Sequence, residues 1–150
     1  MVGFGSNMAA PSEHRADAPR AYTLDTSRRP LVIIRATDAV DDPDAIAAWY
    51  SDVDAFFARG ERFVSLSDMR GAPSDAARRK RFMAFIRPRR AIIQRLCIAH
   101  AMIARSTIEL GFVTAYLWLG GDDVYVPVKL FDSEPAATEW LLSQYRAAGA

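Results

Sequence analysis

The fold of this chain is decided by the stretch Arg62-Phe63-Val64-Ser65-Leu66-Ser67-Asp68-Met69-Arg70-Gly71-Ala72-Pro73-Ser74. Its first half alternates between apolar and polar residues, which predicts a β-strand whose two faces differ. A glycine and a proline then end the pattern, and the most arginine-rich segment of the chain follows as a predicted helix. Asp68, Arg70 and Ser74 therefore gather where a strand leads into a helix, and ligands of α/β sheets bind at such places.

A hairpin and a helix are predicted before this stretch. Residues 21–25 and the β-branched run 31–36 have the spacing of two paired strands, the second in the interior of the sheet. Asp42 then serves as an N-cap, Pro43 fits the first helical position, and Gly60 ends the helix. One face of this helix is apolar, whereas the other is acidic, and no Lys or Arg occurs from 36 to 58.

After the stretch, the helix beginning near residue 75 is expected to be capped by Ser74 and to turn Phe82, Phe85 and Ile86 inward. Pro88 must kink or break it, because proline cannot donate a helical hydrogen bond. Residues 97–104 read as a buried strand.

The last third of the chain continues the alternation. Ser106 and Glu109 form a capping box, which predicts a helix to about residue 119. Residues 124–131 read as a strand that Pro127 places at an edge or a bulge, and Asp132 or Ser133 caps a final helix. The order β-β-α-β-α-β-α-β-α predicts an α/β domain with a mixed or parallel sheet and right-handed crossovers.

The composition indicates one globular domain in a chain of 150 residues, with 51% hydrophobic and 25% charged residues and a net charge of +1. Residues 1–20 are small and polar, so they are expected to form a disordered tail before a domain at 21–147. We find neither an export signal nor an apolar run long enough for a membrane span, and we expect a cytoplasmic protein.

Cys97 and His100 are of residue types that often act in catalysis or metal binding, but each also has a structural interpretation. Cys97, the only cysteine, lies in an apolar run and is expected to be a buried, inert thiol. His100 lies mid-strand among apolar residues, and a neutral, hydrogen-bonded core histidine is favoured over a base or a metal ligand. We recognise no metal-binding set and no cofactor motif, so catalysis is the weaker class of function.

The loop residues Asp68, Arg70 and Ser74 have two interpretations. A phosphate or carboxylate can bind the amide groups behind Ser74 with Arg70 as a forked donor. Alternatively, Asp68 and Arg70 pin the loop to each other and Ser74 only caps the helix.

A basic patch is predicted on the helix that follows. Its residues are Arg78, Arg79, Lys80, Arg81, Arg87, Arg89 and Arg90, with Arg95 beyond them. The segment has no nucleic-acid-binding signature, so nucleic acid is disfavoured as a partner. A solvated face with local salt bridges competes with an acidic protein partner, for which the Asp-rich helix of a second copy is one candidate.

The predicted helix 107–119 is apolar nearly all round, so both of its sides need a cover. A candidate interface lies on one side and comprises Leu110, Val113, Leu117 and Trp118. We hypothesise that a second subunit covers it; alternatively, the N-terminal hairpin or the last helix does.

Several segments together resemble the SpoIIAA-like (STAS-like) small α/β domains of bacteria. They are residues 30–34, 63–71, the arginine-rich helix, 95–99, 115–119, 127–131 and 139–141. The resemblance implies a sheet of four to five strands with about four helices, mainly on one face. It also implies action through protein partners, switched in some members by phosphorylation of a serine after the central strand. Here Met-Arg-Gly-Ala-Pro separates Asp68 from Ser74, so that serine motif is not intact.

The sequence therefore predicts a non-enzymatic regulatory or scaffolding domain that acts through protein–protein contacts and self-associates. The alternative is a domain that binds a small ligand or an anion, with or without catalysis, at the loop around Asp68, Arg70 and Ser74. No cofactor is expected, and the sequence does not identify a small-molecule ligand.

Overall fold

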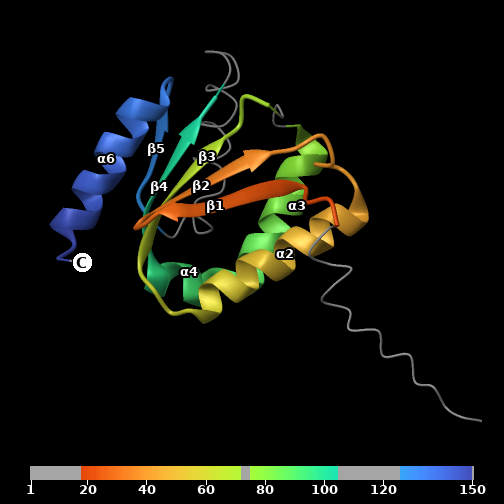
Figure 1. Cartoon of the computed structure of the whole chain (residues 1–150), viewed down its shortest axis with the longest axis horizontal. Helices are drawn as coiled ribbons and strands as arrows, with labels where there is room; N and C mark the ends of the chain where they lie inside the picture. Colours follow the sequence, from red (N-terminus) through yellow and green to blue (C-terminus); the bar gives the residue numbers. More distant parts are fainter. Residues whose placement is uncertain (1–17, 72–74, 105–125, 150) are drawn as a thin grey trace, which may run out of the picture.

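Five strands form one mixed sheet whose spatial order, β1-β2-β3-β4-β5, equals their order in the sequence (Figure 1). A computed structural model describes residues 18–71, 75–104 and 126–149. The strands are β1 (Tyr22–Arg28), β2 (Leu31–Ala36), β3 (Phe63–Asp68), β4 (Cys97–Ile103) and β5 (Val128–Phe131). Strand β1 is antiparallel to β2, whereas β2, β3, β4 and β5 run parallel. The predicted α/β class, the hairpin and the interior position of its second strand are confirmed.

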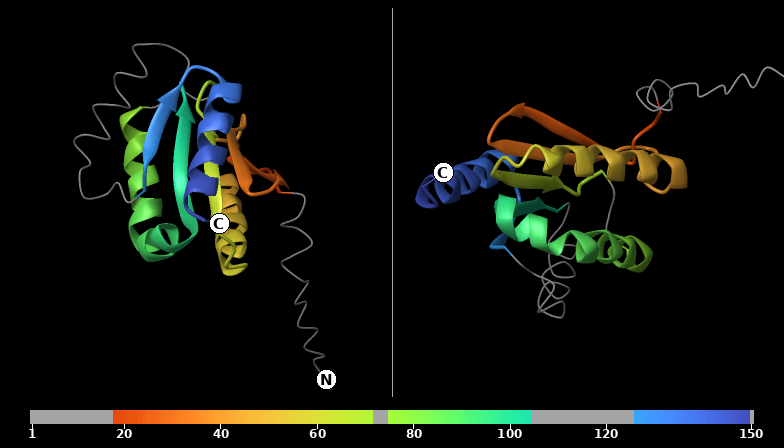
Figure 2. Two further views of the ribbon diagram at one scale, coloured as in Figure 1. Left: turned by 90° about the vertical axis from the view of Figure 1, so that its left-hand side faces the viewer. Right: turned by 90° about the horizontal axis from the view of Figure 1, so that it is seen from below.

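Helices cover both faces of this sheet. They are α2 (Pro43–Ala58), α3 (Ala76–Ile86), α4 (Arg90–Leu96) and α6 (Glu134–Ala147), with a 3₁₀ turn over Arg87–Arg89. Helices α2, α3 and α4 lie on one side and α6 lies on the other (Figures 1 and 2). The crossovers from β2 to β3 and from β3 to β4 therefore use the same face, as right-handed connections between neighbouring parallel strands require.

The helix boundaries follow from local chemistry. The Asp42 carboxylate accepts a hydrogen bond from Ala45 N at 2.9 Å, Pro43 occupies the first turn, and Gly60, with φ +68°, follows the end of α2. At the other end of the chain, Ser133 caps α6 by accepting from Ala136 N. These capping predictions are confirmed, as is the break at Pro88.

The cap of α3 differs from the prediction. Asp75, not Ser74, is the N-cap, and its carboxylate accepts from Arg78 N at 2.8 Å. Aspartate and serine are about equally good caps, so the sequence pattern did not distinguish two adjacent candidates. Ser74 itself lies outside the described residues.

Two further predictions concern the second half of the chain. Strand β5 begins directly after Pro127 and pairs with β4 alone, so it is an edge strand of the sheet, as Pro127 indicated. The capping box at 106–109 and the helix 107–119 lie outside the described residues. In the described part of the chain, no helix combines the length and the apolar character needed to cross a bilayer.

The two faces of the strands build separate cores. Toward α6, the buried side chains come from alternate strand positions and from the helix: Leu31, Ile33, Val64, Leu66, Ala99, Ala101, Ile103, Ala137 and Leu141. Toward α2, α3 and α4, the buried cluster is rich in aromatic residues: Trp49, Phe56, Phe57, Phe63 and Phe85. The buried residues of α2 include Trp49, Val53, Phe56 and Phe57, and those of α6 are Ala137 and Leu141. Phe82, which was expected to face inward, is 43% exposed and is not a core residue.

Candidate functional site

A cavity of about 250 Å³ lies between the sheet and the helices α2, α3 and α4. Its lining includes Leu24, Ile34, Ser65, Ser67, His100, Met102 and Val128 from the strands. The helices contribute Trp49, Tyr50, Phe82, Phe85, Ile86 and Ile93, among others. Most of this lining is apolar, and the polar residues Ser65, Ser67, Asp68 and His100 come from the two strands β3 and β4.

Aromatic stacking explains why this face of the sheet is not filled. The rings of Trp49 and Tyr50 on α2 lie 4.9 and 4.6 Å from that of Phe85 on α3, and Tyr22 on β1 lies 4.7 Å from Trp49. These contacts join α2 to α3 and to the edge of the sheet. Ser65 contributes a short side chain to the middle of the sheet, beside larger lining residues such as Ile34 and Met102.

A hydrogen-bonded pair, Ser65 and His100, forms the polar part of the cavity floor. The two residues are register partners on the parallel strands β3 and β4, and Ser65 Oγ lies 2.6 Å from His100 Nδ1. Ser65 Oγ also lies 3.7 Å from Cys97 Sγ, which donates to the carbonyl of Ala99 at 3.5 Å. The three side chains therefore form a short polar network inside apolar surroundings.

Burial keeps both titratable members of this network uncharged at neutral pH. Desolvation lowers the pKa of His100 to about 4, because the charged imidazolium has little water around it. Desolvation likewise raises the pKa of Cys97 to about 11, although the hydrogen bond to Ser65 opposes the change. The prediction of a buried Cys97 is confirmed. His100 is hydrogen-bonded, as predicted, but it lines a cavity instead of packing in a filled core.

The predicted loop residues Asp68 and Arg70 are bound to each other. Arg70 Nε and Nη2 donate to the two carboxylate oxygens of Asp68 at 2.9 and 2.7 Å, and the backbone N–H of Arg70 donates at 3.1 Å. The side-chain hydrogen bond from Arg70 is the main cause that lowers the pKa of Asp68. The Arg70 guanidinium, which was one candidate for binding an anion, thus already binds the Asp68 carboxylate. This favours the interpretation in which Asp68 and Arg70 hold the loop in place.

An ion-pair cluster extends from Asp68 to α6. Arg35 Nε on β2 lies 3.8 Å from Asp68, and Arg35 Nη2 lies 2.8 Å from Glu134 in the first turn of α6. Arg28 on β1 lies 3.5 Å from Glu134. Sequence reasoning missed this cluster because no local pattern indicates where α6 begins relative to β1 and β2.

The acidic face of α2 and its preceding loop meets the basic segment of the same chain. Arg78 donates to Asp41 at 3.1 and 2.8 Å, and Arg81 reaches the same carboxylate at 3.2 Å. These bonds, Arg78 first, lower the pKa of Asp41 to about 2. Further along, Arg89 donates to Asp54 at 2.7 and 2.9 Å.

Local salt bridges were one of the two interpretations of the basic patch, and they are what these three arginines form. For Arg78, Arg81 and Arg89 the acidic partner is therefore the same chain and not a second copy. Arg78, Arg79 and Arg81 also line the cavity, while Lys80, Arg87 and Arg90 continue the segment along α3 and into α4.

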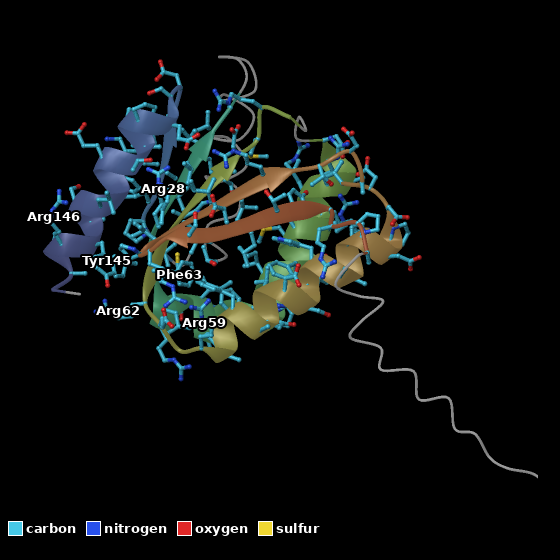
Figure 3. The ribbon with its side chains drawn as sticks, viewed as in Figure 1. Arg28, Arg59, Arg62, Phe63, Tyr145 and Arg146 are labelled. Atoms are coloured by element: carbon cyan, nitrogen blue, oxygen red, sulfur yellow. The ribbon has the colours of Figure 1, made fainter. Side chains whose placement is uncertain are left out.

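Further arginines occur toward the other end of the strands (Figure 3). Arg59 follows α2, Arg62 precedes β3, and Arg146 lies near the end of α6. Arg59 lies 3.4 Å from Glu61, which also pairs with Arg29 at 2.9 Å. Arg29 and Arg59 thus share Glu61 as an acidic neighbour.

The candidate interface residues Leu110, Val113, Leu117 and Trp118 lie outside the described residues. Within the described ranges, no group of three or more His, Cys, Asp or Glu side chains is placed to hold a metal ion. The cavity is therefore the feature that distinguishes this fold from a plainly packed one. Sequence reasoning singled out His100 but missed Ser65 as its partner; the signal was a polar residue inside each of two adjacent buried strands.

No protein-family model, curated protein or solved structure matches this chain. The resemblance to STAS-like domains therefore stays a prediction from the sequence segments.

Proposed function

We propose that this protein binds a small, largely apolar organic molecule in the cavity between the sheet and the helices α2, α3 and α4. The observation that carries the proposal is a partly open pocket of about 250 Å³ whose lining is mainly apolar. Ser65 and His100 form a hydrogen-bonded pair in its floor, and Asp68, Arg78, Arg79 and Arg81 also belong to the lining. Binding sites for small molecules have this character: mostly hydrophobic walls and a few placed polar groups.

The volume is too large for an ordinary packing defect. Protein interiors are close-packed and contain few voids larger than a water molecule. The pocket is partly open to solvent, so water can enter it when no molecule is bound. A bound apolar molecule would displace that water and remove apolar surface from it, at roughly 25 cal/mol per Å².

The volume also limits the ligand. An apolar cavity of about 150 Å³ accommodates benzene, so this one accommodates a molecule of roughly ten non-hydrogen atoms. Ser67, Asp68 and Met69 belong to the lining, which brings the cavity to the loop that the sequence singled out. The ligand-binding alternative is thereby favoured in a changed form, with an apolar molecule beneath the loop instead of an anion on Arg70.

The test compares two serine-to-phenylalanine variants. Ser67→Phe places a ring in the cavity, whereas Ser51→Phe places one on the exposed face of α2. With α-methylstyrene as the probe in titration calorimetry, we expect binding to the wild type and to Ser51→Phe, and at least tenfold weaker binding to Ser67→Phe. Equal affinity of all three proteins would contradict the proposal, and so would an experimental structure in which the chain's own side chains fill the cavity.

We also propose that the chain is a divergent STAS-like domain. Support comes from the matching sequence segments, the five-stranded mixed sheet and the three helices α2, α3 and α4 on one face. The regulatory role, self-association through helix 107–119 and a cytoplasmic location stay predictions. Light scattering at high protein concentration tests self-association, and a strict monomer would refute it.

A further inference from the structure

The polar network in the cavity floor determines what kind of polar group the ligand can carry. This inference rests on the proposed function, and it begins with the protons of Ser65, Cys97 and His100. Cys97 is a thiol at neutral pH, and its S–H group donates to the carbonyl of Ala99. That proton is therefore not available to Ser65.

The single hydroxyl proton of Ser65 then has two possible acceptors. His100 Nδ1 lies 2.6 Å from the hydroxyl oxygen, whereas Cys97 Sγ lies 3.7 Å from it. An imidazole nitrogen is a good acceptor and a thiol sulfur is a weak one, so the serine proton lies on the short contact. His100 Nδ1 accepts this bond, and in a neutral imidazole the ring proton must then be on Nε2.

The Nε2–H group of His100 makes no hydrogen bond to any residue that the structure describes, and the ring lines the cavity. A second N–H group in the same lining is also unsatisfied. The indole of Trp49 is only 6% exposed, and its Nε1 has no acceptor among the described residues. Buried polar groups in native proteins are normally hydrogen-bonded, and Trp49 Nε1 is a buried donor without a partner. His100 is not fully buried and lines the cavity, where a ligand can accept a hydrogen bond from its ring.

We infer that the ligand carries an uncharged hydrogen-bond acceptor, such as the carbonyl of a ketone, ester or amide, and that His100 Nε2–H donates to it. Ser65 acts as a positioning residue, since its hydroxyl holds the ring in the tautomer that donates. The acceptor beside His100 is uncharged because the neutral imidazole offers no counter-charge there, and an unpaired carboxylate would lose its hydration. Of the arginines in the lining, Arg78 and Arg81 already pair with Asp41.

The test uses two probes of nearly equal shape. Acetophenone has a carbonyl oxygen where α-methylstyrene has a methylene group, and each fits the size limit given above. The affinity ratio of the two is measured by titration calorimetry for the wild type, His100→Phe and His100→Gln. Because the ratio is compared between proteins, general effects of each substitution on the cavity largely cancel.

We expect His100→Phe to weaken the binding of acetophenone about tenfold relative to that of α-methylstyrene. A tenfold loss of affinity corresponds to the loss of about one hydrogen bond. His100→Gln keeps an N–H donor and should retain most of the preference. Ser65→Ala should reduce the preference for acetophenone over α-methylstyrene about threefold, because the imidazole ring is then free to change tautomer. Benzoate should bind the wild type at least tenfold more weakly than acetophenone.

Two results distinguish a failure of the acceptor inference from a failure of the proposed function. If both probes bind with the same ratio to the wild type and to His100→Phe, the acceptor inference is wrong while the proposed function stands. If neither probe binds the wild type, both are wrong. A readout that needs no variant is the ¹⁵N spectrum of the imidazole: a proton on Nε2 supports the inference, and a proton on Nδ1 overturns it.

Discussion

On the face of the sheet that α6 covers, Ile33 and Leu66 are 1% and 0% exposed, and Ala137 and Leu141 of α6 belong to the same buried cluster. On the opposite face, the next residues along the same strands, Ile34 and Ser65, line a cavity. Neighbouring residues of one strand thus belong to two regions with different packing. Both faces carry a buried cluster, but the pocket lies only on the face that α2, α3 and α4 cover.

The largest expected effect comes from comparing two adjacent isoleucines. Ile33→Ala removes a fully buried side chain from the α6 face, and we expect it to lower the free energy of unfolding by about 3–4 kcal/mol. Ile34→Ala removes the same atoms from a partly exposed side chain in the cavity lining, so the expected loss is about 1–2 kcal/mol. Urea denaturation measures both. Equal losses would show that the two faces are packed alike.

The second prediction uses the titration of His100. Its pKa is about 4 in the folded protein and about 6.5 in an unfolded chain, so between these values the unfolded state binds more protons. The free energy of unfolding should therefore be complete above pH 6.5 and fall by up to about 3 kcal/mol as the pH drops to 4. The carboxyl groups with lowered pKa, such as Asp41, titrate below this window.

The control for this titration is His100→Phe, whose stability should change little between pH 6.5 and 4.5. Denaturation midpoints measured across that range test the difference between the two proteins. A wild type that parallels the variant would mean that the His100 side chain is well hydrated, contrary to its place in an apolar cavity.

The smallest expected effect concerns the contact between α2 and α3 that forms the cavity wall. Asp54→Asn removes an exposed ion pair with Arg89 and should cost less than about 1 kcal/mol, diminishing further in high salt. Arg89→Ala should cost more, about 1–2 kcal/mol. The same guanidinium also donates to the carbonyl of Phe85 and lies 4.1 Å from the centre of its ring. Thermal denaturation of both variants at low and high salt compares them, and equal losses would assign the whole contribution of Arg89 to its charge pair.

Local signals in the sequence were sufficient for most of the elements. Asp42 with Pro43, Gly60 and Pro88 placed the start of one helix, its end and the break of the next, because each acts within a few residues of its own position. The alternating pattern of 63–68 likewise predicted a strand with two different faces, and the structure places that strand at the centre of the sheet.

What the sequence did not predict depends on how distant segments meet. Ser65 and His100 become partners only through the register of β3 on β4, which neither strand specifies by itself. The pairing of Asp41 with Arg78 requires α2 and α3 to lie side by side in one chain. The charge pattern predicted an acidic segment and a basic segment, but it did not indicate whether they pair within one chain or between two copies.

The strand order has a consequence for co-translational folding. Each strand pairs with the one made just before it, so the sheet can lengthen in step with translation and needs no distant segment to begin. The α6 face is different: its apolar residues on β2, β3 and β4 stay uncovered until residues 134–147 have emerged. A chain stalled before that point would expose an aggregation-prone hydrophobic surface. A chaperone that binds nascent chains would therefore be needed most before residues 134–147 have emerged.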